Sequence, residues 1–215
     1  HGKTELISRR FIPWLLGRDE YRNIIFATYN EPFSQDIGSD CRTIMQSPGF
    51  KQVFPKFRFR LGGLSKEKLQ AAEGGMAAFV GRGGSITGRG ADILIIDDPI
   101  KDSEEAQSPT LRAKLWDWFT QVAMTRLMTK FACVVVVHTR WHEDDLAGRL
   151  LALAQSDPNA DQWTVIKLPG IAEDEHVGTR CGRTCIQRCG LAALRPQLDD
   201  RHAVNATRQR RSAIR

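Results

Sequence analysis

Residues 93–99 read Ile93-Leu94-Ile95-Ile96-Asp97-Asp98-Pro99, four aliphatic side chains followed by two carboxylates. A short, continuous apolar run of this kind is typical of a strand buried on both faces, as in the parallel sheet of an α/β protein. The two acids would then stand at the carboxyl end of the strand, where α/β sheets bind their ligands. The alternative interpretation is an ordinary strand that ends in a turn, because Asp-Asp-Pro also has good turn chemistry.

Apolar runs alternate with longer amphipathic stretches throughout residues 1–170, a pattern typical of an α/β fold. The glycine-rich segment Gly74–Gly90 predicts a hairpin and a loop instead of a helix. We therefore predict a three-layer α/β domain with a mainly parallel sheet. Its expected strands are Asn23–Thr28, Ile93–Asp97, Cys133–His138 and Trp163–Leu168, and its expected helices are Thr4–Leu16, Pro32–Ser47, Pro109–Leu127 (with Ser108 as N-cap) and Glu143–Ala154.

The composition is that of an ordinary soluble protein. Of 215 residues, 41% are apolar and 26% are charged, which allows one sizeable core and excludes disorder and collagen. No apolar run approaches the roughly 18 residues that a membrane helix needs, and the opening residues lack the apolar region of a signal peptide. We expect a cytosolic protein without a membrane partner, and the missing initial Met is consistent with an internal fragment.

The last part of the chain differs in composition from the rest. Residues 178–215 hold nine Arg, no Lys and two acids, whereas the preceding residues carry 22 basic and 23 acidic side chains. The three cysteines in this tail lack the spacing and the fourth ligand of a zinc site, and the segment shows no strand or helix periodicity. Three interpretations stay open: a frameshifted or otherwise non-native C-terminus, a basic arm that binds nucleic acid, and a plain disordered tail.

Gly2-Lys3-Thr4 comes directly before a predicted helix and matches the last three positions of the phosphate-binding loop G-x-x-x-x-G-K-[ST]. In that loop Gly lets backbone amides approach the phosphates, Lys reaches the β and γ oxygens, and the hydroxyl coordinates Mg²⁺. The first half of the loop is absent, and a solvent-exposed helix start would also explain the tripeptide. The acids at Asp97 and Asp98 favour the nucleotide interpretation, because ATPases hold Mg²⁺ with an acid at a strand end and orient water with a following carboxylate.

The predicted strand Cys133–His138 is followed directly by Thr139. A Thr beside the γ-phosphate can report the state of the nucleotide to a moving part of a protein. Polar residues that cap the next helix are the alternative interpretation. If the three assignments hold, Lys3, Asp97 and Thr139 should lie together at one edge of the sheet, because each begins or ends an element there.

Several longer runs surround these motifs and occur in a fixed order. They are Asp97–Asp102 with Glu105 and Ala106, Trp116–Phe119, Thr125–Leu127 and Thr139–Leu150, together with His1–Glu5, Ala27–Asn30 and Gly83–Gly90. Over about residues 1–175 they resemble the ATPase domain of terminase large subunits from tailed bacteriophages and prophages.

The resemblance implies an ASCE-type P-loop NTPase that hydrolyses ATP with Mg²⁺ to drive double-stranded DNA into a preformed capsid. It implies a homo-oligomeric ring, the portal protein and the terminase small subunit as partners, and a place in the cytoplasm of the bacterial host and transiently at the capsid portal. We expect no counterpart of the family's C-terminal nuclease domain in this sequence. We therefore expect residues 1–175 to be the ATPase domain without the start of its phosphate loop, and residues 176–215 to be a tail outside it.

The resemblance also implies which residues bind the nucleotide. Gly2, Lys3 and Thr4 match the phosphate-binding loop. Thr4 and Asp97 match the two protein ligands of Mg²⁺, and Thr139 matches the motif that couples nucleotide state to movement.

Two further residues are implied in catalysis. Asp98 matches the catalytic carboxylate, at a position where ASCE ATPases more usually have Glu, and Asp has the shorter reach. Arg89, at the end of the glycine-rich segment, is a candidate arginine finger for its own or a neighbouring subunit's nucleotide.

Two other functions stay open beside the packaging motor. One is an inactive prophage remnant, which folds but turns nothing over. The other is a different P-loop ATPase that acts on nucleic acid, although a helicase would need two tandem motor domains, for which 215 residues give no room.

Overall fold

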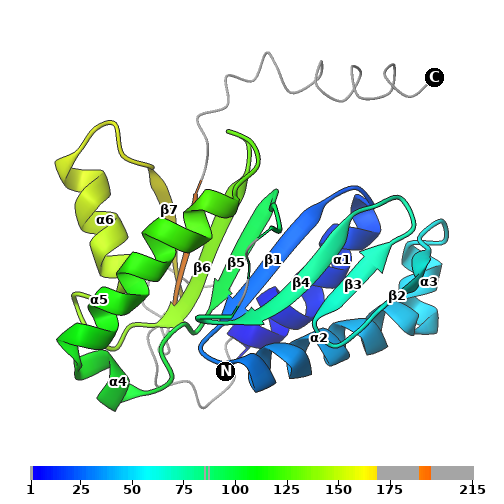
Figure 1. Cartoon of the computed structure of the whole chain (residues 1–215), viewed down its shortest axis with the longest axis horizontal. Coiled ribbons are helices and arrows are strands. Elements are labelled where there is room, and N and C mark those ends of the chain that lie inside the picture. The colour runs from blue at the N-terminus through cyan, green and yellow to red at the C-terminus, as the bar shows by residue number, and fades with distance from the viewer. Residues whose placement is uncertain (1, 85, 87, 169–188, 195–215) are drawn as a thin grey trace, which may run out of the picture.

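The four predicted strands belong to an eight-stranded sheet in the computed structural model, which describes residues 2–84, 86, 88–168 and 189–194 (Figure 1). The strand order across the sheet is β2-β3-β4-β1-β5-β6-β8-β7. In chain order the strands are β1 (Asn23–Thr28), β2 (Phe59–Leu64), β3 (Lys68–Ala71), β4 (Met76–Gly81), β5 (Ile93–Asp97), β6 (Cys133–Thr139), β7 (Trp163–Leu168) and β8 (Cys189–Leu194).

The middle of the sheet is parallel, and both outer parts are antiparallel. Strands β4, β1, β5 and β6 run in one direction. On one side β2 and β3 continue antiparallel from β4, and on the other β8 runs against both β6 and β7. The α/β class and the parallel centre are confirmed, while the sheet as a whole is mixed.

Helices cover both faces of the sheet and make three layers (Figure 1). Each layer of helices has its own apolar cluster against the sheet. One face is covered by η1 (Glu5–Phe11), α1 (Ile12–Arg18), α2 (Glu31–Gln46) and α3 (Pro48–Val53), and the other by α4 (Ser103–Gln107), α5 (Pro109–Trp118), η2 (Phe119–Ala123), η3 (Met124–Arg126) and α6 (Leu146–Ser156).

Successive residues of the central strands enter opposite clusters, as the pleat of a strand requires. Phe26 of β1 and Ile95 of β5 pack with α1 and α2, whereas Ile25 and Leu94 pack with α5 and α6. All five residues of β5 are buried. The continuous apolar run at 93–96 is therefore explained by a strand that has helices on both sides.

Local capping fixes where five helices begin. In each case the side chain before the helix accepts a hydrogen bond from the backbone amide three residues later, which satisfies a donor that the helix leaves free. Ser108 plays this part for α5, as expected. The capping residues are Asn30, Ser47, Asp102, Ser108 and Asp145.

Two predicted helices are continuous in the structure but change their hydrogen-bond pattern along the way. The first starts as the π-helix η1 and continues as α1 to Arg18, and the third passes from α5 through η2 and η3 to Arg126.

The hairpin expected in Gly74–Gly90 joins β3 to β4, and Gly74 supplies a φ of +106° in its turn. None of the helices among the described residues is long and apolar enough to cross a membrane.

Four strands were not among those expected from the sequence, and one of them is β4, which lies within the glycine-rich segment expected as a hairpin and a loop. β2 is the outermost strand and β3 lies next to it; β2 has two glycines and β3 only four residues, so neither shows the long apolar run of a buried strand. β8 lies within residues 178–215, where we expected no regular structure. For Cys189–Leu194 that expectation was wrong, because these residues form a strand. The backbone of β8 pairs with the edge of β6 and so satisfies its hydrogen-bonding groups. The three interpretations of residues 178–188 and 195–215 lie outside the described residues.

Candidate functional site

Three segments that are distant in sequence meet at the carboxyl ends of β5 and β6. The Lys3 ammonium donates a hydrogen bond to Thr139 Oγ1 at 2.7 Å and lies 3.7 Å from Asp98 Oδ1. Only 13% of the Lys3 side chain is exposed. The prediction that the start of the first helix and the ends of these two strands share one edge is confirmed.

Asp97 is the buried member of this group, with no exposed surface. Its Oδ2 accepts a hydrogen bond of 2.6 Å from the Ser8 hydroxyl, and the Thr4 hydroxyl lies near the carboxylate. Burial raises the pKa of Asp97 to about 6, and the neighbouring charge of Asp98 adds to the rise, while Ser8, Thr4 and Lys3 oppose it. The fold therefore holds a carboxylate that lacks enough positive charge around it.

The second oxygen of that carboxylate, Asp97 Oδ1, is buried and has no hydrogen-bond partner among the described residues. A buried acceptor without a partner costs free energy, and a divalent cation would satisfy it. The Thr4 hydroxyl beside it is the second oxygen that Mg²⁺ prefers. No group of three or more His, Cys, Asp or Glu side chains in the described part of the chain could hold a metal, so a cation here would need further oxygens from a phosphate or water. The donor set thus fits Mg²⁺ bound together with a phosphate.

Asp98 leaves β5 in an unusual conformation, with φ of +42°. For a residue with a side chain this region is sparsely populated and is tolerated where the surroundings fix it. Here the Asp98 amide donates to the Val137 carbonyl at 2.8 Å, and Asp98 Oδ1 accepts from the Thr139 amide at 3.2 Å. β6 therefore holds the carboxylate toward Lys3 and Thr139.

Two more buried polar groups end the neighbouring strands. Thr28 Oγ1, at the end of β1, and both ring nitrogens of His138, in β6, have no hydrogen-bond partner among the described residues. Burial lowers the pKa of His138, which is 3% exposed, so its imidazole is neutral at physiological pH. Sequence reasoning missed Ser8 and Thr28 as site residues. Ser8 lies four positions after Thr4, and this spacing places both hydroxyls on one helix face.

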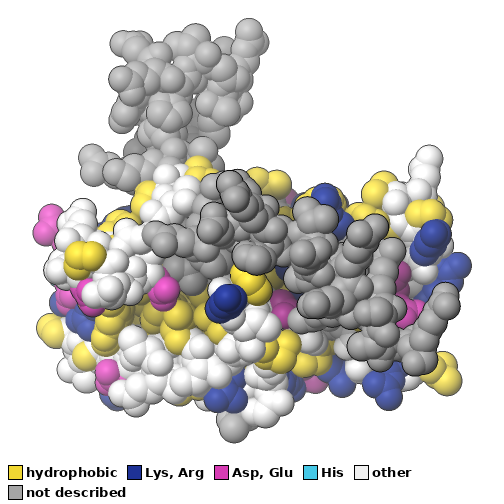
Figure 2. Space-filling model, turned by 90° about the horizontal axis from the view of Figure 1, so that it is seen from above, with side chains coloured by type: hydrophobic (Ala, Val, Ile, Leu, Met, Phe, Trp, Pro, Cys, Tyr) yellow, Lys and Arg dark blue, Asp and Glu magenta, His cyan; other side chains and the backbone are white. Residues whose placement is uncertain are grey.

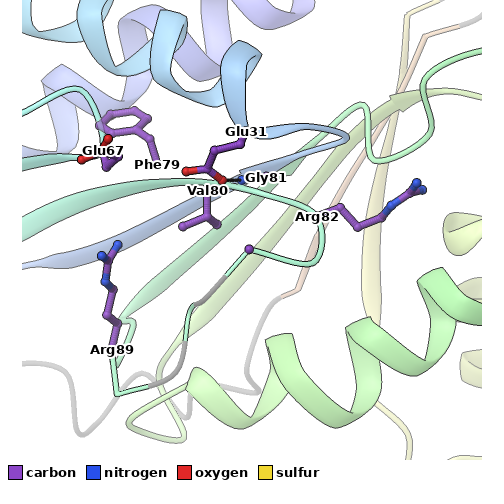
Figure 3. Close-up of a pocket in the computed structure, with 8 residues that line it drawn as sticks. Glu31, Glu67, Phe79, Val80, Gly81, Arg82 and Arg89 are labelled. Carbon is purple, nitrogen blue, oxygen red and sulfur yellow. Dashed lines mark hydrogen bonds between the residues drawn. The ribbon is translucent and has the colours of Figure 1, made fainter.

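Arg89 lines a cavity of about 510 Å³ beside the end of β4 (Figure 3). Its Nη1 is buried without a hydrogen-bond partner among the described residues. No hydrogen bond or ion pair in the described part of the chain joins Arg89 to Lys3, Asp97, Asp98 or Thr139, so its role as an arginine finger stays a prediction. The other residues that line the cavity are Glu31, Glu67, Phe79, Val80, Gly81, Arg82 and Gly84.

Arg82 is held differently from Arg89. It pairs with Glu105 and donates to the Pro99 carbonyl at 2.9 Å, so it ties the loop after β4 to the segment that follows Asp98.

The family model for the N-terminal region of the T4-like virus type of terminase large subunit matches residues 1–214. The chain belongs to this terminase family. No curated protein matches it.

Among solved structures, this terminase chain is similar to a Thermoplasma acidophilum protein proposed to be a methyltransferase. The two share 10% sequence identity at a TM-score of 0.35, over 83% of this chain and 69% of the other. A TM-score and a sequence identity this low do not establish a shared function. The family match also runs through residues 176–214, and the domain boundary at residue 175 stays a prediction.

Proposed function

We propose that this terminase chain is an ATPase motor domain, which couples hydrolysis of Mg²⁺-bound ATP to the movement of double-stranded DNA into a capsid. The observation that carries the proposal is the contact of the Lys3 ammonium with Thr139 and Asp98, beside the buried carboxylate of Asp97. A cation, two carboxylates and a strand-end hydroxyl at one sheet edge are the groups that phosphoryl transfer requires.

Gly2, Lys3 and Thr4 would bind the phosphates from the start of the first helix. The Lys3 ammonium is held by Thr139 and Asp98, and a β- or γ-phosphate oxygen would compete for it with a stronger, charge-assisted hydrogen bond. Thr4 and Asp97 would hold Mg²⁺, which when bound neutralises the charge that develops on the transferred phosphoryl group. Asp97 binds a metal only in its ionised form, so this site should weaken below about pH 6.

Asp98 would orient the attacking water and accept its proton. Its bond from the Thr139 amide fixes one carboxylate oxygen, and the side chain is one-third exposed, which leaves it open to solvent. Thr139 would act in coupling, since its hydroxyl contacts Lys3 and that contact would change as the γ-phosphate arrives and leaves. Arg89 would complete the site as an arginine finger for its own or a neighbouring subunit's nucleotide.

The proposed packaging role requires other proteins as partners. The terminase would act as a homo-oligomeric ring on the portal protein, with a small subunit that recognises the viral DNA, in the cytoplasm of the bacterial host. The membership of the family supports these partners.

Two substitutions test the proposal: one should weaken nucleotide binding, and the other should lower turnover. Both are made in a version of the chain with a complete phosphate-binding loop ahead of Thr4. Lys3→Ala removes a charge contact to the phosphates, so it should weaken binding of Mg²⁺-ATP by about tenfold or more. Asp98→Asn should leave binding within several-fold but lower turnover by roughly two to three orders of magnitude, because it removes only transition-state stabilisation. Lys114→Ala, at an exposed lysine of α5, is the matched control and should change neither.

Each outcome has a clear meaning. Near-normal turnover of Asp98→Asn would move the catalytic role to another acid, with Asp102 and Glu104 next along the loop. A chain that folds but does not bind Mg²⁺-ATP would be the inactive remnant. Turnover stimulated by nucleic acid, without packaging in the presence of portal and procapsids, would indicate a different nucleic-acid ATPase.

A further inference from the structure

Positive charge gathers at one end of the body, although residues 1–177 as a whole carry nearly equal numbers of acids and bases. Residues 51–68 hold six basic side chains and a single acid, Glu67. Five of the six are exposed: Lys51, Lys56, Arg58, Arg60 and Lys66. We call these five residues the basic end.

The basic end lies on α3, on β2 and on the turns that flank β2. In Figure 1 these elements form the right-hand end of the molecule, and Figure 2 shows dark-blue Lys and Arg side chains at the same end. Lys51, Lys56, Arg60 and Lys66 form no ion pair with any described residue, whereas Arg58 faces the carboxylate of Glu20. Four of the five charges are therefore free to bind an external anion.

A simpler explanation covers part of the basic end. β2 is the outermost strand of the sheet, and cations on an edge strand prevent pairing with another chain. This accounts for Arg60, within the strand, and for Arg58, beside it. It does not account for Lys51 in α3, Lys56 in the following turn, or Lys66 in the turn between β2 and β3, because none of these lies in the strand.

We propose that the basic end is a surface on which this chain contacts the phosphate backbone of double-stranded DNA. A duplex presents one negative charge for about every 1.7 Å of its axis, and a set of unpaired cations spread over several elements matches such a row of phosphates. Two large apolar side chains, Val53 and Leu61, are exposed in the same segment, which is less than an apolar protein interface requires. The choice of duplex DNA rests on the proposed packaging function.

The surface is separate from the nucleotide site. β2 is four strands away from β5, which carries Asp97, and no residue of the basic end contacts Lys3, Asp97, Asp98 or Thr139 in the described part of the chain. DNA binding at the basic end therefore needs no nucleotide, and the two activities can be measured independently.

The test compares three variants of the full chain that each lose three positive charges. The first is Lys51→Gln/Lys56→Gln/Arg60→Gln at the basic end. The second is Lys101→Gln/Lys114→Gln/Lys130→Gln, at exposed lysines on other elements. The third is Arg208→Gln/Arg210→Gln/Arg211→Gln, in the Arg-rich tail. Binding of a mixed-sequence duplex of about 30 base pairs is followed by fluorescence anisotropy between about 50 and 200 mM salt, without nucleotide.

We expect the basic-end variant to bind the duplex at least about tenfold more weakly at 100 mM salt, with a log–log salt slope reduced by about 2 to 3. The other two variants should keep the slope of the parent within about 1. Thermal unfolding of the same preparations should be unchanged in the basic-end variant. Mg²⁺-ATP binding, measured with the same substitutions in the version with a complete phosphate-binding loop, should also be unchanged.

Four results would overturn the proposal. They are no duplex binding by the parent chain, an equal loss in either of the other two variants, tighter binding to single-stranded RNA than to the duplex, and binding to anionic lipid vesicles in preference to DNA. Absence of Mg²⁺-ATP binding in the version of the parent with a complete phosphate-binding loop would instead contradict the proposed motor function and leave the proposed DNA surface unaffected.

Discussion

Substitution of Asp97 by Asn should stabilise the fold at neutral pH, in a way that depends on pH. The pKa of Asp97 is about 6 in the fold and 3.8 ordinarily. The folded state thus binds a proton more tightly than the unfolded chain between these two values, so the free energy of unfolding falls as pH rises from about 4 to 6. Above pH 6 the ionised, buried carboxylate costs about 3 kcal/mol, at about 1.36 kcal/mol per pKa unit.

An Asn at this position carries no charge and can still accept the hydrogen bond from Ser8. Its amide group must be buried where Asp97 Oδ1 now lacks a partner, and this adds a cost that does not vary with pH. The free energy of unfolding of the variant relative to the parent should therefore rise by roughly 2 kcal/mol between pH 4 and pH 8.

Urea denaturation across this pH range, in the presence of a chelator, measures the effect. Asp102→Asn is the matched control, because Asn caps the start of α4 as well as Asp does, and it should stay within about 0.5 kcal/mol of the parent throughout. A difference between Asp97→Asn and the parent that does not change with pH would refute the argument that Asp97 is held at a cost. In that case its burial would not be evidence for a cation site.

Other parts of the structure give further predictions. Ser8→Ala removes a donor to the ionised carboxylate and should raise the pKa of Asp97, so Mg²⁺-ATP binding, measured by titration calorimetry, should fall more at pH 6 than at pH 8; an equal fall at both would contradict this. Ending the chain after Glu175 removes β8, the only described neighbour of β7, and should lower the melting temperature by about 5 °C or more; an unchanged melting temperature would show that β8 does not contribute. Gly38→Ala in α2 would force its Cβ against the Lys66 carbonyl oxygen and should cost about 2 kcal/mol or more in chemical denaturation, whereas Gly49→Ala, with room around it, should cost less than 1 kcal/mol.

Much of the fold was predictable because its signals are local. The apolar runs at 23–28 and 93–97 became strands with the predicted bounds, since a strand buried between two layers of helices needs apolar side chains at nearly every position. The run at 163–168 also became a strand with the predicted bounds, although it lies at an edge of the sheet and exposes Val165 and Ile166. The helix that follows Ser108 also began as expected, because capping depends only on residues within one turn. Four strands were not predicted. β2 is an outermost strand with two glycines, and β3 has only four residues. β4 lies in the glycine-rich segment, and β8 contains small residues and is held by backbone pairing with β6 and β7.

For the site, the sequence by itself determined that Lys3, Asp97 and Thr139 lie at one edge, because parallel strands end on the same side of a sheet. Only the tertiary structure showed that Ser8 bonds to Asp97, that the Thr139 amide bonds to Asp98, and that Arg89 lines a cavity at the end of β4. The two hydrogen bonds join residues that are 89 and 41 positions apart in the sequence, and the cavity depends on where a loop lies. All three therefore depend on how the helices and strands pack. Periodicity and spacing determine which elements form and where they end, whereas packing determines which polar atoms meet and which stay buried without a partner.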